Sequence, residues 1–114
     1  MNAAECTLYR IGEEIGVDPE VILATSHGRR AIDVLQIYQP SLANWDYVCY
    51  RESLIPKEFG ADAIEIPGAR ALLDHVHQRK VPWCIVTSGT RPLVTGWLDV
   101  LGLAHPENLV TAEE

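Results

Sequence analysis

The residues best placed to do chemistry are two hydroxyl side chains and a glycine in one turn, Thr87, Ser88 and Gly89. They follow an apolar run, 81–86, which predicts a short buried strand, and a helix is predicted to start at Pro92. In open α/β sheets, ligands bind at the carboxyl ends of strands, where backbone amides and a helix N-terminus meet. The segment 81–91 therefore predicts a site for a phosphate-sized anion.

Spacing alone also fits a simpler role for this turn. Thr90 stands where an N-cap residue would be, so residues 87–90 could do no more than cap the helix that follows. Spacing by itself favours this helix cap, and a phosphate contact needs support from the rest of the chain.

Helical patterns fill the first part of the chain. Apolar spacing predicts four helices, at 3–15, 19–25, 29–38 and 42–54. Gly16 is expected to end the first helix in a left-handed conformation, and Asp18 with Pro19 to start the second. Pro56 is expected to end the fourth helix.

The pattern changes after Gly60 to one of strands and helices. The expected elements are a turn at Pro67-Gly68, a helix over 69–80, the strand to 86, a helix capped by Gly102, and the start of a second strand at 109–111. The predicted fold class is therefore α/β with about two strands. Two short strands cannot supply the parallel neighbours that bury both faces of a sheet, so this part is expected to be incomplete.

Length, charge and cysteine content exclude several classes of protein. The 114 residues suit one domain or part of one, and nine basic against sixteen acidic side chains give a net charge of −7. No basic cluster suits nucleic acid or an anionic membrane, no run is long enough to span a bilayer, and no secretory signal is evident. Three cysteines without metal-ligand spacing indicate reduced thiols and a cytoplasmic location.

Three phrases carry a resemblance to a known superfamily. They are Ile-Pro-Gly-Ala-Arg-Ala-Leu-Leu at 66–73, Val-Thr-Ser-Gly-Thr at 86–90 and Ser-His-Gly-Arg-Arg at 26–30. With them the chain resembles the haloacid dehalogenase-like hydrolase superfamily, and within it the fungal phosphatases of glycerol phosphate and 2-deoxyglucose 6-phosphate. The resemblance covers nearly the whole chain. It implies a helical cap over 1–63 and a partial Rossmannoid core over 64–114.

The superfamily implies phosphoryl transfer in two steps. An aspartate of an Asp-x-Asp motif attacks phosphorus, the second aspartate acts as general acid and base, and Mg²⁺ held by further carboxylates neutralises charge. The hydroxyl turn and a later lysine bind the phosphoryl oxygens. On this resemblance Thr87, Ser88 and Gly89 are expected to bind phosphate while also capping the helix, and either hydroxyl is a candidate for the motif residue.

The chain departs from that pattern at three of the four active-site elements. It has no Asp-x-Asp, neither Lys57 nor Lys80 follows the turn, and no Gly-Asp-x-x-x-Asp segment is present. We therefore expect a fragment of a phosphatase for small sugar or polyol phosphates, with Mg²⁺ bound by the complete family member and by no residue of this chain. It is expected to be inactive alone, because the nucleophile and the metal carboxylates are missing.

Three polar residues between 27 and 30 are candidates for substrate contact. His27, Arg29 and Arg30 lie at a helix start in the implied cap, so closure of the cap is expected to bring them to the substrate's polar tail. A solvated helix turn, in which Gly28 is only a breaker, explains the same residues equally well.

Other reactive residue types have structural explanations. Cys84 is followed by six residues before Arg91, one more than a thiol phosphatase loop uses, and its apolar neighbours predict a place in the core. His75 and His77 point to nearly opposite sides of a helix, so no metal site is expected there. The three tryptophans are expected in the core or between cap and core, and they are Trp45, Trp83 and Trp97.

Two functions remain open from sequence. The first is the phosphatase fragment, whose ligand would be a small phosphorylated metabolite. The alternative is a non-catalytic remnant or a partner-binding cap module, and a weaker third possibility is complementation by a chain that carries the missing strands. Because the strand at 82–86 lacks a neighbour on one side, we expect self-association through it.

Overall fold

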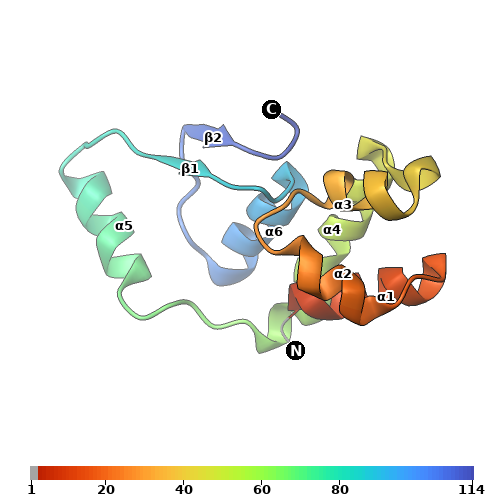
Figure 1. Cartoon of the computed structure of the whole chain (residues 1–114). Helices are drawn as coiled ribbons and strands as arrows, with labels where there is room; N and C mark the ends of the chain where they lie inside the picture. Colours follow the sequence, from red (N-terminus) through yellow and green to blue (C-terminus); the bar gives the residue numbers. More distant parts are fainter. Residues whose placement is uncertain (1–2) are drawn as a thin grey trace.

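The computed structural model describes residues 3–114, in which helices dominate and two short strands form one parallel sheet (Figure 1). The helices are α1 (Ala3–Ile15), α2 (Pro19–Ser26), α3 (Ala31–Tyr38), α4 (Trp45–Phe59), α5 (Ala69–Gln78) and α6 (Arg91–Leu101). The strands are β1 (Cys84–Val86) and β2 (Asn108–Val110), and two 3₁₀ turns occupy Pro40–Leu42 and Gly60–Asp62. This content is compatible with the predicted α/β class. Met1 and Asn2, the start of the implied helical cap, lie outside the described residues.

The junction between α1 and α2 confirms the predicted stop and restart. Gly16 has a φ of +74°, the left-handed conformation expected after a helix end. The Asp18 side chain then accepts a hydrogen bond from the Glu20 amide at 3.0 Å, and Pro19 occupies the first turn of α2. Local sequence rules are sufficient to fold this corner.

The predicted end of the fourth helix at Pro56 is wrong. Asn44 starts α4 by accepting a hydrogen bond from the Tyr47 amide at 2.8 Å, and the helix continues past Pro56 to Phe59. Pro56 is buried against α6, close to Gly96. Packing against α6 therefore compensates for the backbone hydrogen bond that a proline removes inside a helix.

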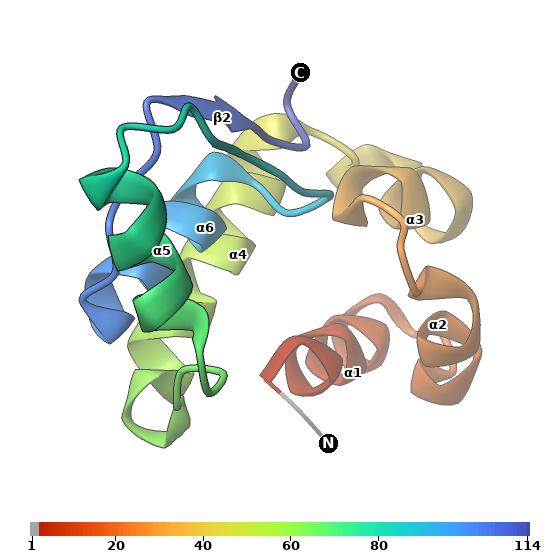
Figure 2. The ribbon, with the colours of Figure 1, turned by 90° about the vertical axis from the view of Figure 1, so that its left-hand side faces the viewer.

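A buried hydrophobic cluster lies among the first four helices. Ile11 of α1, Leu35 of α3 and Val48 of α4 form a cluster of buried side chains, and Trp45 packs against it. Helices α4 and α6 share the most extensive contact between elements, and they lie side by side in Figure 2. The hydroxyl turn is thus joined to the helical part through α6.

The sheet leaves one edge and one face uncovered by the rest of residues 3–114. Ile85 pairs with Leu109, and the Thr87 amide donates to the Val110 carbonyl at 3.0 Å. Since amides along a strand alternate in direction, the Val86 amide points to the opposite, open edge. In Figure 1, α5 stands to one side of the sheet and does not cover that edge.

The prediction that Cys84 lies in the core is wrong. Cys84 is exposed and Val86 is 71% exposed, whereas Ile85 between them is half-buried. Side chains alternate along a strand, so these two residues share the face that no described element covers. Ile64 and Ile66 are also exposed, at 88% and 78%, and belong to no strand.

Candidate functional site

The hydroxyl turn between β1 and α6 is held by its own hydrogen bonds. The Thr87 hydroxyl accepts from the Gly89 amide at 3.1 Å, and the Gly89 carbonyl accepts from the Ala112 amide at 2.9 Å. A Cβ on residue 89 would lie 2.9 Å from Leu93 Cδ2, so only glycine fits there without displacing that side chain. Ser88 at the tip is exposed and, within the described part of the chain, has no hydrogen-bond partner.

Two acidic side chains hold the next amides of the turn. The Thr90 amide donates to Glu52 Oε2 of α4 at 2.8 Å, and the Arg91 amide donates to Glu113 Oε1 at 3.0 Å. Thr90 takes the predicted N-cap position of α6, but its side chain makes no capping hydrogen bond. Carboxylates are favoured at a helix N-terminus because the unpaired amides and the helix dipole are positive there. The amide of Ser88 and the hydroxyl protons of Thr87 and Ser88 therefore remain for a ligand at the turn.

The pKa values of the two glutamates move in opposite directions. Burial raises the pKa of Glu52, and hydrogen bonding by Thr90 offsets the rise only in part. Burial would also raise the pKa of Glu113, but hydrogen bonds from Thr111 and from the Arg91 amide bring it below its usual value. Glu113 is thus a firmly charged cap, while Glu52 carries its charge at a cost.

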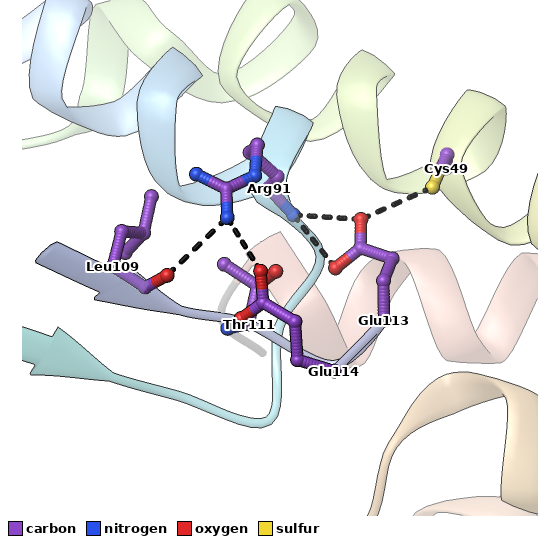
Figure 3. A network of polar contacts seen from close by, with 6 residues as sticks. All are labelled: Cys49, Arg91, Leu109, Thr111, Glu113 and Glu114. Atoms are coloured by element: carbon purple, nitrogen blue, oxygen red, sulfur yellow. Dashed lines mark hydrogen bonds and ion pairs between the residues drawn. The ribbon is translucent and has the colours of Figure 1, made fainter.

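A polar network ties the end of the chain to α6 and α4 (Figure 3). The Arg91 guanidinium donates to the Leu109 carbonyl at 3.2 Å and to Glu114 Oε1 at 2.7 Å. Cys49 Sγ lies 3.4 Å from Glu113 Oε1, and its pKa is raised to about 11 by burial and by the negative charge of Glu113. The network orders residues 111–114 beside the turn.

The thiols of Cys49 and Cys84 differ in exposure, and this difference predicts which of them reacts faster. Cys49 is expected to react with iodoacetamide at least about tenfold more slowly than exposed Cys84, because only the thiolate attacks and Cys49 keeps its proton. Timed alkylation followed by peptide mass spectrometry measures both rates in one sample. Glu113→Gln should speed up Cys49 selectively, and equal rates for the two thiols in the unaltered chain would contradict the contact.

One cavity of about 320 Å³ brings most of the predicted site residues together. Thr87, Ser88 and Gly89 line it, and so do His27 and Arg29 from the corner between α2 and α3. The residues are separated by about sixty positions in sequence, so only the fold brings them together. A cavity of this size suits a small metabolite.

Arg30, the third predicted substrate residue, does not line this cavity. Its guanidinium donates to both carboxylate oxygens of Asp33, at 2.8 and 3.0 Å, and to the Ala112 carbonyl at 2.9 Å. It also lies over the Trp45 ring, 5.7 Å from the centroid. In this arrangement Arg30 connects α3 to the end of the chain, and the side-chain hydrogen bond from Arg30 lowers the pKa of Asp33.

Sequence reasoning missed three polar residues that the structure brings to the cavity or the turn: Arg51, Glu52 and Glu113. A signal for the first two was present. Arg51 and Glu52 follow Val48 by three and four positions and precede Ile55 by four and three, so they occupy the apolar face of α4. A charged residue at such a position indicates a buried partner or a ligand.

The described residues do not fit a divalent cation. Among residues 3–114, no three His, Cys, Asp or Glu side chains lie close enough together to hold a metal ion. No helix in that range is long and apolar enough to cross a membrane.

Known proteins are similar to this chain over most of its length. No family model matches it. The chain is 36% identical over 98 residues to glycerol-1-phosphate phosphohydrolase 2 of Saccharomyces cerevisiae. This match covers 85% of the chain and 39% of that protein. It is 36% identical over 100 residues to hexitol phosphatase A of Escherichia coli, covering 86% of the chain and 46% of that protein.

A third relative extends the match to almost every residue of the chain. The chain is 35% identical over 121 aligned positions to 2-deoxyglucose-6-phosphate phosphatase 1 of Saccharomyces cerevisiae, covering 96% of the chain and 49% of that protein. The chain belongs to the haloacid dehalogenase-like hydrolase superfamily. It spans less than half the length of each of these three relatives. The names of these haloacid dehalogenase-like relatives describe phosphatases, as the resemblance implies.

Proposed function

We propose that this chain supplies the phosphate-binding turn and the helical cap of a phosphatase that acts on small sugar or polyol phosphates. The observation that carries the proposal is the single cavity lined both by the turn, with Ser88 at its tip, and by His27 and Arg29 of the helical part. The names of the relatives, which are phosphatases of glycerol phosphate, hexitols and 2-deoxyglucose 6-phosphate, support this class of substrate.

Within this proposal, each group of the cavity has a distinct role. Ser88 binds a phosphoryl oxygen, because it is exposed and its hydroxyl and amide make no hydrogen bond to another described residue. Thr87 and Gly89 hold the turn in shape, since the Gly89 amide donates to the Thr87 hydroxyl. His27 and Arg29 face the remainder of the substrate from the helical cap (1–63), while the partial core (64–114) carries the turn.

These 114 residues are proposed to bind such a ligand without hydrolysing it. They contain no Asp-x-Asp pair to supply the nucleophile and general acid, and the described residues offer no site for the Mg²⁺ that the complete family member would use. Hydrolysis would need carboxylates from outside this sequence. The compartment that suits such an enzyme is the cytoplasm.

Binding of inorganic phosphate to the chain tests the proposal by isothermal titration calorimetry. Ser88→Ala is expected to weaken phosphate binding about tenfold, because a hydrogen bond to a charged group contributes about 1.5–3 kcal/mol. Ser41→Ala, an exposed serine outside the cavity, is the matched control and should leave affinity unchanged. Equal affinities for both variants would overturn the proposed site. Hydrolysis of a general phosphomonoester with Mg²⁺ by the purified chain would overturn the predicted inactivity.

The open edge of β1 favours a second candidate, a module that pairs with another chain. The Val86 amide points to this edge, and the Val86 side chain beside it is 71% exposed. We propose self-association through β1 as its simplest form. Sedimentation velocity over a range of concentrations tests it, and a monomer throughout that range would contradict it.

A further inference from the structure

Arg51 occupies a position where an apolar side chain would be expected. It shares one face of α4 with Val48 and Ile55, which are 2% and 5% exposed, and its own side chain is 17% exposed. All three residues line the 320 Å³ cavity, together with Ser88. Burying a guanidinium is costly unless its donors are used, so its partners decide what it does there.

The donors of Arg51 are largely unused within the described part of the chain. Its Nε is buried and has no hydrogen-bond partner, and its one ion pair joins NH1 to Glu14 Oε1 at 3.3 Å. Arg30, Arg70 and Arg91 are more exposed, at 42–48%, yet each makes two or more hydrogen bonds to carboxylates and carbonyls. The most buried of these four arginines is therefore the least satisfied.

Arg51 lines the same cavity as other groups with unused donors. Glu52, the next residue of α4, reaches the Thr90 amide at 2.8 Å, so α4 approaches the turn closely at this point. Ser88 also has no hydrogen-bond partner among the described residues. Two residues with free donors, far apart in sequence, thus line one cavity. The Nε edge of a guanidinium offers two parallel donors, which match two oxygens of a phosphate.

We propose that Arg51 is a phosphate-binding residue of this cavity, supplied by the helical cap. Its Nε edge binds the phosphoryl group of a small phosphorylated metabolite whose other oxygens are held at Ser88. This inference rests on the proposed function for the position of the phosphoryl group. It also explains how a chain with a net charge of −7, with Glu52 and Glu113 beside the turn, attracts an anion.

Calorimetric titration of the chain with inorganic phosphate tests the proposal. Arg51→Gln is expected to weaken binding at least tenfold, and Arg51→Lys to restore only part of the loss because an ammonium group lacks the two-donor edge. Arg79→Gln removes the same charge from an exposed position outside the cavity and should stay within twofold of the unaltered chain. Affinity of Arg51→Gln equal to that of Arg79→Gln would overturn the proposal.

A second measurement needs no variant of the cavity. In the unaltered chain, the ¹⁵N resonance of Arg51 Nε should shift on addition of phosphate, while that of Arg79 should not. An unshifted Arg51 resonance at saturating phosphate overturns the inference even if Arg51→Gln fails to fold.

The outcomes separate this inference from the proposed function. Loss of affinity in Ser88→Ala but not in Arg51→Gln leaves the proposed function standing and removes Arg51 from the site. Loss in Arg51→Gln but not in Ser88→Ala supports the anion site on α4 and removes the turn. Absence of phosphate binding by the unaltered chain overturns both.

Discussion

Replacing Gly96 with alanine is expected to lower the free energy of unfolding by about 1–2 kcal/mol, although alanine favours helices by about 1 kcal/mol over glycine. Gly96 lies in the middle of α6, where it faces α4. A Cβ at this position would lie 2.7 Å from Pro56 Cγ and 3.1 Å from Pro56 Cβ. The ring of a proline cannot move to another rotamer, so α4 and α6 must separate to relieve the contact.

The expected loss of stability arises at the contact that links the hydroxyl turn to the rest of the chain. Helices α4 and α6 share the most extensive contact between elements, and α6 begins directly after the turn. Equilibrium unfolding by urea measures the change in free energy. A more stable Gly96→Ala variant would show that helix propensity outweighs packing here, and would contradict the close approach of the two helices.

A double-mutant cycle provides the control. Pro56→Ala removes the ring that the new methyl group would meet, so Gly96→Ala should cost at least about 1 kcal/mol less in that background. The single variant Pro56→Ala also restores an amide to α4, which limits its own effect. Additive effects of the two substitutions would mean that the clash lies elsewhere.

Pro56 also shows how far sequence reasoning extends into this fold. Elements with local causes were predicted closely, such as the corner at Gly16 and Asp18 and the order strand, turn, helix around Ser88. A proline in a helical pattern is a strong stop signal, and nothing near it in sequence cancels that signal. The compensating contact comes from Gly96, forty positions away, and only the folded chain provides it.

The candidate site also contains residues that could be predicted from sequence and residues that could not. The turn was predictable because its residues are consecutive and their types are restricted. The positions of Arg51 and Glu52 on the apolar face of α4 were visible in the sequence, but their target was not, since Glu52 meets Thr90 across 38 positions. Arg30 illustrates the opposite case, in which a residue of suitable type makes its contacts with Asp33 and Ala112.

Glu52→Ala is expected to lower the free energy of unfolding by about 1–3 kcal/mol, the cost of leaving a buried donor without a partner. Thr90 is completely buried, and its amide donates to Glu52 Oε2 at 2.8 Å. Alanine removes that acceptor, and the amide of a residue with no exposed surface loses its partner. Glu52→Gln keeps an acceptor oxygen at the same position without the charge, so it should retain most of the stability.

The charge of Glu52 should also make the stability difference between Glu52→Gln and the unaltered chain depend on pH. Burial raises the pKa of Glu52 in the folded chain, so the folded state binds this proton more tightly than the unfolded state. The cost of the charged carboxylate is therefore absent below the unfolded pKa and grows as pH rises through the folded pKa. Relative to the unaltered chain, Glu52→Gln should therefore gain stability as pH rises above the ordinary pKa of a glutamate, about 4.3, and the gain should level off above the raised pKa of the folded chain.

Comparison at each pH is necessary because other carboxylates act in the opposite direction. The pKa values of Asp33, Glu113 and Glu114 are lowered in the folded chain, so their contributions are lost as pH falls. The contributions of Asp33 and Glu114 are common to the unaltered chain and Glu52→Gln and cancel in the difference, whereas Glu113 repels the charge of Glu52 and adds to the cost that the difference measures. Suppose that the difference in free energy of unfolding between Glu52→Gln and the unaltered chain does not change with pH, while Glu52→Ala remains destabilised. Glu52 would then contribute only an acceptor at the turn, and its charge would carry no energetic cost.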